Sequence, residues 1–220
     1  MGQKRSLKRV AVLMTLLALI LSFLPAMAEQ KYTALPAVFK VQVESQDRYE
    51  GNKEQYIYKE YLKTSNPRVD ADVRRIVDEM DAAYSPLLVP QAQARAKLYN
   101  RLDIEVNYFP TGQSALSTLI IARNTHKKQQ KDVAVVARVY DLATGDIITL
   151  DTLFGEDSPA WDILSQGVKE HLSTTFPKEE RDISLVEALC QQDALKEAAF
   201  TLSGMELTLH YPLATLFPGK

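Results

Sequence analysis

The sequence predicts an α+β fold, with a mainly antiparallel sheet and two or three helices packed on one face. Several segments show alternating apolar and polar residues, which is the pattern of a strand with one buried face. These segments follow one another in runs along the chain. Strong helical periodicity interrupts these runs at two places and does not alternate with single strands. Strands that cluster in this way are typical of α+β domains.

The first two strands are expected near the start of the domain. Residues 39–44 alternate strictly between apolar and polar side chains, and residues 55–62 are rich in tyrosine. Residues 47–53 between them have the composition of a turn. We therefore expect the two segments to be neighbours in the sheet.

Further strand patterns follow in the middle and at the end of the chain. Residues 102–108 show the clearest alternation, and residues 205–211 repeat it near the end. Residues 116–122 and 133–140 are more continuously apolar, which is typical of central strands covered on both faces. A short strand is expected at 147–150, after a turn.

Two helices are marked by their start signals. Asn66-Pro67 places an N-cap residue before a proline at the first helical position. A second helix is expected to begin at Ser158-Pro159 and to end before Pro177. A third, weaker pattern begins at Ser184, where Glu187 completes the spacing of a capping box.

Residues 1–28 predict a cleaved signal peptide. Basic residues precede an uncharged stretch of 15 residues, 10–24, and Pro25-Ala26-Met27-Ala28 supplies a small-x-small cleavage site. The apolar stretch is short for a membrane span, which needs about 20 residues, and a retained N-terminal anchor is the alternative. We expect a periplasmic or extracellular protein that begins at Glu29 and forms a single domain over 29–220.

Cleavage would change the charge of the chain. The precursor holds 26 basic and 28 acidic residues; the signal holds four of the basic ones and none of the acidic ones, which leaves 22 and 28 and a net charge of −6. Neither balance favours nucleic acid as a partner. No second apolar run approaches membrane length, so we expect no membrane association after cleavage.

The sequence lacks the common motifs of hydrolases and nucleotide-binding enzymes. It contains no G-x-S-x-G elbow, H-E-x-x-H, P-loop, glycine-rich dinucleotide turn or S-x-x-K. These absences are compatible with a site assembled from residues far apart in the chain. We therefore favour a non-enzymatic protein with no catalytic residue assigned, and keep an envelope hydrolase with a dispersed active site as the alternative.

The metal-binding residue types are scattered. His126 stands beside two lysines, His171 on an amphipathic helix and His210 on the polar face of the last strand. Three aspartates surround the Thr144-Gly145 turn, but the D-x-D-x-D-G spacing of a calcium loop is absent. We expect neither a metal nor a cofactor. The single Cys190 excludes an intrachain disulfide and a lipoprotein anchor; we expect it to be buried, with pairing between chains as the alternative.

Tyrosines are the most suggestive candidates for ligand binding. The chain has ten, and Tyr49, Tyr56, Tyr58 and Tyr61 crowd the predicted first hairpin. A half-exposed tyrosine strip can stack on sugars or anchor a protein interface. The alternative is ordinary aromatic pairing between strands.

One segment resembles a known family. The segment resembles the order "YD…TG…(I/L)TL.DLF" of exported RsiV-like domains. The matching residues are Val139-Tyr140-Asp141-Leu142, Thr144-Gly145-Asp146 and residues 148–154. The family is named for the extracellular part of the anti-sigma-V factor, and a related domain precedes a peptidoglycan deacetylase. Weaker similarity extends over roughly residues 38–218.

The resemblance implies an α+β envelope domain that binds something outside the cytoplasm, and the best-known member recognises lysozyme. It implies no catalytic residue. Only nine residues precede Val10, too few for the cytoplasmic segment of an anti-sigma factor, and no deacetylase follows residue 220. We therefore expect neither sigma-factor control nor deacetylation, and favour a domain that binds lysozyme or peptidoglycan.

Overall fold

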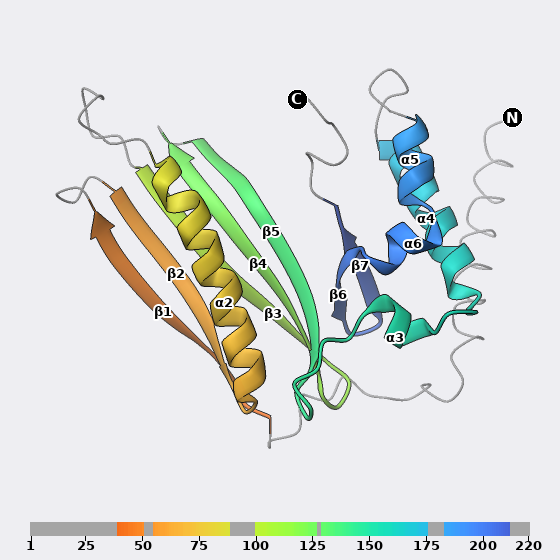
Figure 1. The fold of residues 1–220 in the computed structure, drawn as a ribbon, viewed down its shortest axis with the longest axis horizontal. Helices are drawn as coiled ribbons and strands as arrows, with labels where there is room; N and C mark the ends of the chain where they lie inside the picture. The colour runs from red at the N-terminus through yellow and green to blue at the C-terminus, as the bar shows by residue number, and fades with distance from the viewer. Residues whose placement is uncertain (1–38, 51–54, 89–99, 127–128, 176–182, 212–220) are drawn as a thin grey trace, which may run out of the picture. The chain divides into compact units, whose positions relative to one another are not determined.

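The computed structural model describes residues 39–50, 55–88, 100–126, 129–175 and 183–211 (Figure 1). They form a five-stranded sheet, a separate two-stranded sheet and the helices that pack on them. This arrangement confirms the predicted α+β class and the mainly antiparallel sheet. The predicted signal peptide lies outside the described ranges, and within them no helix is long and apolar enough to cross a membrane.

The five-stranded sheet has its strands in chain order. They are β1 (Val41–Glu50), β2 (Gln55–Thr64), β3 (Asn100–Thr111), β4 (Ala115–His126) and β5 (Gln129–Asp141). Neighbouring strands run antiparallel, except that β2 and β3 run parallel and pair over five residues. The sequence patterns do not reveal this parallel pair.

The parallel pair requires a crossover, which α2 (Pro67–Tyr84) and the short 3-10 helix η1 (Ser85–Leu87) provide within the described residues. The predicted start signal is confirmed. Asn66 is the N-cap, and its side chain accepts a hydrogen bond from the Arg68 amide at 3.0 Å. Such a cap contributes about 1 kcal/mol, and Pro67 occupies the position where a missing N–H is harmless.

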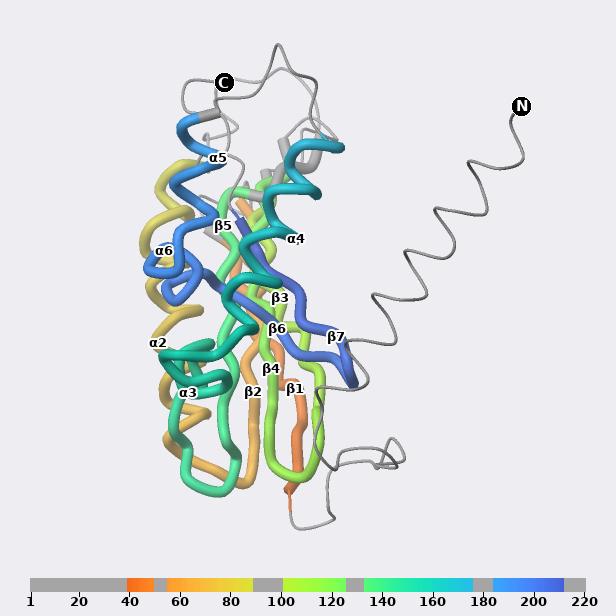
Figure 2. Tube along the Cα trace, turned by 90° about the vertical axis from the view of Figure 1, so that its right-hand side faces the viewer, coloured from red at the N-terminus to blue at the C-terminus, as the bar shows by residue number. Residues whose placement is uncertain are grey.

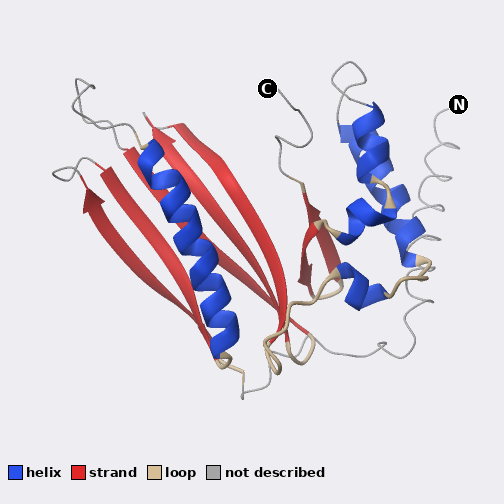
Figure 3. Ribbon diagram, in the orientation of Figure 1, coloured by secondary structure: helices blue, strands red, loops and turns tan. Residues whose placement is uncertain are grey.

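The helix α2 covers one face of this sheet and forms the larger core with it (Figures 2 and 3). Side chains alternate between faces along a strand, so residues of one parity on each strand face α2. The most completely buried of these core residues are Ile57, Leu102, Ile104, Leu116, Ile120, Ala122 and Tyr140 on the sheet, with Val69, Val73 and Val77 on the helix.

The second face is covered at one end by the rest of the described chain. This part comprises α3 (Leu150–Phe154), α4 (Ala160–Thr175), α5 (Ile183–Leu189), α6 (Gln192–Lys196), β6 (Ala199–Ser203) and β7 (Glu206–His210). The strand β6 lies against β3, β4 and β5. Its Leu202 amide donates to Ser117 Oγ at 2.8 Å, and Thr111 Oγ1 donates to the Leu202 carbonyl at 3.1 Å.

The predicted second helix is α4 and the predicted last strand is β7, but the local detail differs at two places. The weak third helix is two short helices, α5 and α6. The strand expected at 147–150 is not formed: Ile147 makes only a single isolated bridge, to Tyr140. Leu150 already begins α3, because Thr149 and Thr152 form a capping box there.

The Thr144-Gly145 turn docks onto the start of α2. Asn66 Nδ2 donates to the Leu142 carbonyl and Arg68 Nη1 to the Thr144 carbonyl, both at 3.0 Å. Gly145 has φ +81°, and a Cβ there would lie 2.8 Å from Asn66 Oδ1. Glycine is therefore required both by its backbone conformation and by the space available.

Candidate functional site

The four candidate tyrosines divide between the two faces of the sheet. Tyr49, Tyr56 and Tyr58 point away from α2, whereas Tyr61 points towards it and is 2% exposed. Period-two alternation explains the division, because 56 and 58 share a parity that 61 does not. We use the name tyrosine face for the side chains of Asp47, Tyr49, Tyr56, Tyr58, Arg101 and Asp103 on β1, β2 and the start of β3.

The outer part of the tyrosine face is an aromatic pair with a cation beside it. Tyr49 and Tyr56 are cross-strand partners, their ring centroids 5.0 Å apart at an interplanar angle of 52°. The Arg101 guanidinium carbon lies 4.9 Å from the Tyr56 centroid and 5.9 Å from that of Tyr58. Tyr49 keeps 58% of its surface exposed. A broad ring surface therefore faces outward with an arginine next to it.

A carboxylate holds that arginine in place. Arg101 Nε donates to both Asp103 carboxylate oxygens, at 2.5 and 2.6 Å, and Asp103 is buried while Arg101 is exposed. Charge-assisted bonds of this kind fix a long side chain. Neither Arg101 nor Asp103 is a candidate by sequence pattern, because they reach Tyr56 and Tyr58 through the parallel pairing of β2 with β3.

The inner part of the face is held by Glu60. One carboxylate oxygen accepts from Tyr58 Oη at 2.9 Å, and the other accepts from the Val106 amide at 2.9 Å. The hydrogen bond to Glu60 raises the pKa of Tyr58. The backbone pairing of β2 with β3 ends at Lys59 and Ile104. Beyond that point the Glu60 carboxylate connects the two strands through its hydrogen bond from the Val106 amide. The Tyr58 hydroxyl is therefore held by a carboxylate that is itself bonded to the backbone of β3.

Tyr61 belongs to a network that ties β1 and β2 to α2. Its hydroxyl donates to Asp78 at 2.9 Å, and the Arg74 guanidinium lies 4.3 Å from its ring centroid. Lys59 lies 3.1 Å from Asp78 and 3.0 Å from Asp81. Such contacts are packing contacts, and Tyr61 is not available to a ligand on the tyrosine face.

The two histidines whose side chains are described lie on different elements. His171 is on α4, and its ring is 3.4 Å from the Thr175 hydroxyl; His210 is on β7, with Nε2 3.0 Å from Thr201 Oγ1. Burial lowers the pKa of His210. Thr201 is itself buried, whereas His210 is half-buried. The side chain of His126 lies outside the described part.

The aspartates around the turn have separate partners. Asp146 lies 3.2 Å from Arg68, and Asp151 lies 3.2 Å from Lys196. Asp141 closes the turn itself, its side chain accepting from the Ala143 amide. Among the described residues no three His, Cys, Asp or Glu side chains gather as a metal site. Cys190 is a buried free cysteine, and burial raises the pKa of its thiol.

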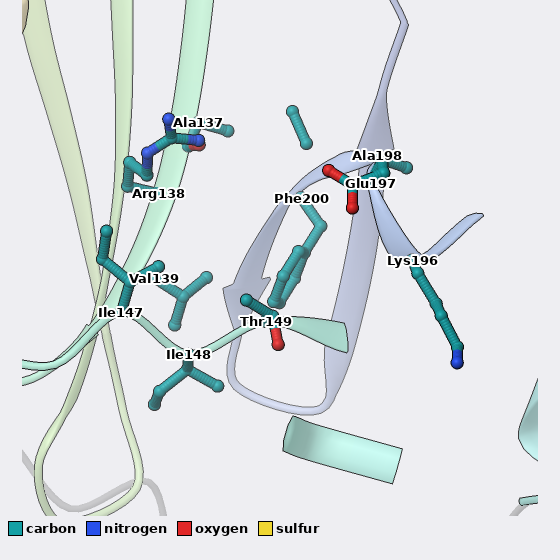
Figure 4. Close-up of a pocket in the computed structure, with 11 residues that line it drawn as sticks. Ala137, Arg138, Val139, Ile147, Ile148, Thr149, Lys196, Glu197, Ala198 and Phe200 are labelled. Carbon is teal, nitrogen blue, oxygen red and sulfur yellow. The ribbon is translucent and has the colours of Figure 1, made fainter. Parts of the chain in front are cut away.

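A small hollow lies between the end of β5 and the start of β6 (Figure 4). Its lining is mixed, with Val139, Ile148 and Phe200 beside polar residues, and Lys196 extends away from it. Its volume is about 110 Å³, well below the roughly 300 Å³ at which small-molecule sites begin. The hollow is a packing gap between two parts of the fold, so the tyrosine face is the stronger candidate.

Among solved structures, two DUF3298 family proteins are similar to this chain. No family model matches it, and no curated protein matches it in sequence. A crystal structure of a DUF3298 family protein from Pseudomonas aeruginosa PAO1 is 15% identical with a TM-score of 0.40, over 63% of this chain and 66% of that one. A DUF3298 family member from Bacteroides fragilis NCTC 9343 is 12% identical with a TM-score of 0.33, over 64% and 71%.

Both similar structures belong to a family whose name carries no activity. That name is DUF3298, and it does not by itself establish the RsiV-like family that residues 139–154 resemble. The chain spans slightly less than two thirds of the Pseudomonas protein's length.

Proposed function

We propose that this chain is a non-enzymatic binding domain of the cell envelope, whose ligand is a lysozyme-like protein or a wall polymer bound at the tyrosine face. The observation that carries the proposal is the Tyr49–Tyr56 pair, with Tyr49 exposed and Tyr56 half-buried, and Arg101 beside it. Tyrosine and arginine are among the residue types that dominate binding energy at interfaces.

The chemistry of the face suits either ligand. Tyrosine rings offer an apolar surface for the C–H faces of sugars or for the side chains of a protein, and a hydroxyl that makes a hydrogen bond. Arg101 is already held by Asp103, so a ligand would not have to restrain a mobile side chain. Preorganisation of this kind reduces the entropy cost of binding.

The charge of the domain adds support for a basic protein ligand. With residues 1–28 removed, the chain would carry a net charge of −6. Lysozyme is basic, and opposite net charges speed the encounter of two proteins at low salt.

The test is a binding measurement at low salt, with immobilised protein exposed to lysozyme and, separately, to purified peptidoglycan. We expect one of the two to bind, and the double variant Tyr49→Ala/Tyr56→Ala to weaken binding by about tenfold or more, which corresponds to about 1.4 kcal/mol. Tyr108→Ala is the matched control, because Tyr108 is 37% exposed on β3 but has the parity that faces α2.

Circular dichroism would confirm that both variants remain folded. If the unmodified chain binds neither ligand, the proposal is wrong. An equal loss of binding in Tyr108→Ala would place the contact elsewhere and would likewise exclude the tyrosine face.

A further inference from the structure

The strand β1 has an outer edge that is unpaired within the described residues. It pairs with β2 along all ten of its positions and is the first strand in the sheet order. The Ser65 amide donates to the Lys40 carbonyl at 3.1 Å, so even-numbered residues turn their backbone groups towards β2. Backbone groups alternate in direction along a strand, so those of Val43, Ser45, Asp47 and Tyr49 point outward.

The side chains of β1 are arranged symmetrically about Gln46. Val43 and Tyr49 are the exposed large apolar residues of this strand, at 42% and 58%, and each is three positions from Gln46. Glu44 and Arg48 have opposite charges and each is two positions from it. The apolar pair lies on the tyrosine face, and the charged pair lies on the α2 face, where Arg48 reaches Asp81.

We propose that β1 pairs antiparallel with β1 of a second copy of this chain, about a two-fold axis through Gln46. In that register Val43 lies opposite Tyr49 of the other copy on one face, and Glu44 lies opposite Arg48 on the other, each contact occurring twice. Cross-strand apolar and opposite-charge pairs stabilise a sheet. Arg48 also binds Asp81, so the Glu44 carboxylate of the other copy would join an existing ion pair across the axis.

Neighbouring registers that keep the faces aligned are less favourable. An axis through Asp47 would set Asp47 against its own copy and Glu44 against Glu50, and like charges directly opposite are destabilising. An axis through Ser45 would set Val43 against Asp47. Charged residues on an edge strand usually prevent pairing; here their symmetric positions permit one register.

The dimer would join two tyrosine faces into one surface, with each Tyr49 three positions from the two-fold axis. A strand-to-strand contact is smaller than the roughly 1,200–2,000 Å² of stable interfaces. We therefore expect a dimer that dissociates on dilution. This inference needs no ligand, so it stands or fails separately from the proposed function.

Cross-linking tests the register. In Gln46→Cys the two thiols would be direct opposites in a non-hydrogen-bonded pair with Cα atoms about 4.5 Å apart, which suits a disulfide. Gln42→Cys is the matched control on the same face of β1, where the two copies would be eight residues apart, about 27 Å. Under copper-phenanthroline oxidation we expect several-fold more cross-linked dimer from Gln46→Cys. Equal cross-linking, or none in either variant, would overturn the proposal.

Sedimentation velocity over a concentration series tests the dimer itself. We expect a concentration-dependent dimer that Glu44→Lys weakens by about tenfold, since like charges then meet at both symmetric contacts. Glu187→Lys, the same charge change on the exposed surface of α5, should leave the dimer unchanged. A chain that stays monomeric up to its solubility limit, or an equal effect of both variants, would refute the self-pairing.

Discussion

The two faces of the β1–β2 hairpin carry the same residue types in different surroundings. Beneath α2, Tyr61, Lys59 and Asp81 are enclosed, and Arg48 binds Asp81 through two hydrogen bonds of 2.5 and 2.8 Å. On the tyrosine face, Tyr49 and Arg101 are exposed to solvent and Tyr56 is half-buried. Residue type alone therefore does not assign a role: the parity along the strand and the cover above it decide.

The largest expected effect comes from removing a tyrosine on each face. Tyr61→Ala should lower the free energy of unfolding by about 4 kcal/mol, because it empties a buried aromatic site and removes one of the two hydrogen bonds that Asp78 accepts from β2. Tyr49→Ala should cost only about 0.5 kcal/mol, the value of an exposed cross-strand pair. Urea denaturation of both variants measures the contrast, and similar losses would contradict the division of the faces.

A smaller effect is expected where the Thr144-Gly145 turn anchors α2. Gly145→Ala should destabilise the fold by about 2 kcal/mol, since the added Cβ meets Asn66 in addition to the strain of a positive φ. Gly112→Ala is the control with φ +61° and no atom within 4 Å of the added Cβ, and should cost about 1 kcal/mol. Thermal unfolding of the two variants gives the difference, and equal losses would show that contact with Asn66 is unimportant.

The smallest effect is an acid sensitivity confined to the helix-covered face. Burial acts to raise the pKa of Asp81, but hydrogen bonds from Lys59 and Arg48 outweigh it and lower the pKa. The unfolded chain then binds protons more readily than the folded one, so this contribution is present above the unfolded pKa of about 3.9 and is lost as the pH falls below it. Asp72, bonded by Arg75 and Tyr140, acts in the same direction, since these bonds outweigh its burial.

Urea denaturation at pH 7 and pH 3 measures that loss. In Asp81→Asn the difference between the two pH values should shrink, because the substituted side chain no longer titrates. An unchanged difference would mean that Asp81 does not contribute to the acid sensitivity.

The starts of α2 and α4 and the five strands of the larger sheet were predictable from local signals, whereas α3 and β6 were not. Asn66-Pro67 fixes the start of α2 through a cap and a proline, both of which act within a few residues. Applied to the hairpin, the period of two also separates Tyr61 from Tyr56 and Tyr58 by their positions in the sequence. Grouping all four tyrosines as one strip overlooks that period.

The cation of the candidate site was not predictable in the same way. Arg101 reaches Tyr56 only because β3 lies parallel to β2, and that pairing depends on how α2 crosses the sheet. Alternation of apolar and polar residues describes one strand and does not identify its neighbour. Likewise, β6 contacts the sheet through hydrogen bonds that Leu202 makes with Ser117 and Thr111, 85 and 91 residues away in sequence, which no local pattern encodes.

The single parallel pair has a consequence for the order in which the chain assembles. The β1–β2 hairpin and the β3–β4–β5 meander consist of antiparallel neighbours, whose contacts are local and form quickly. Their union through five parallel residue pairs and the Glu60 carboxylate requires the intervening helix to be in place. We therefore expect docking of α2 to be the late step that joins two early-formed pieces into one sheet.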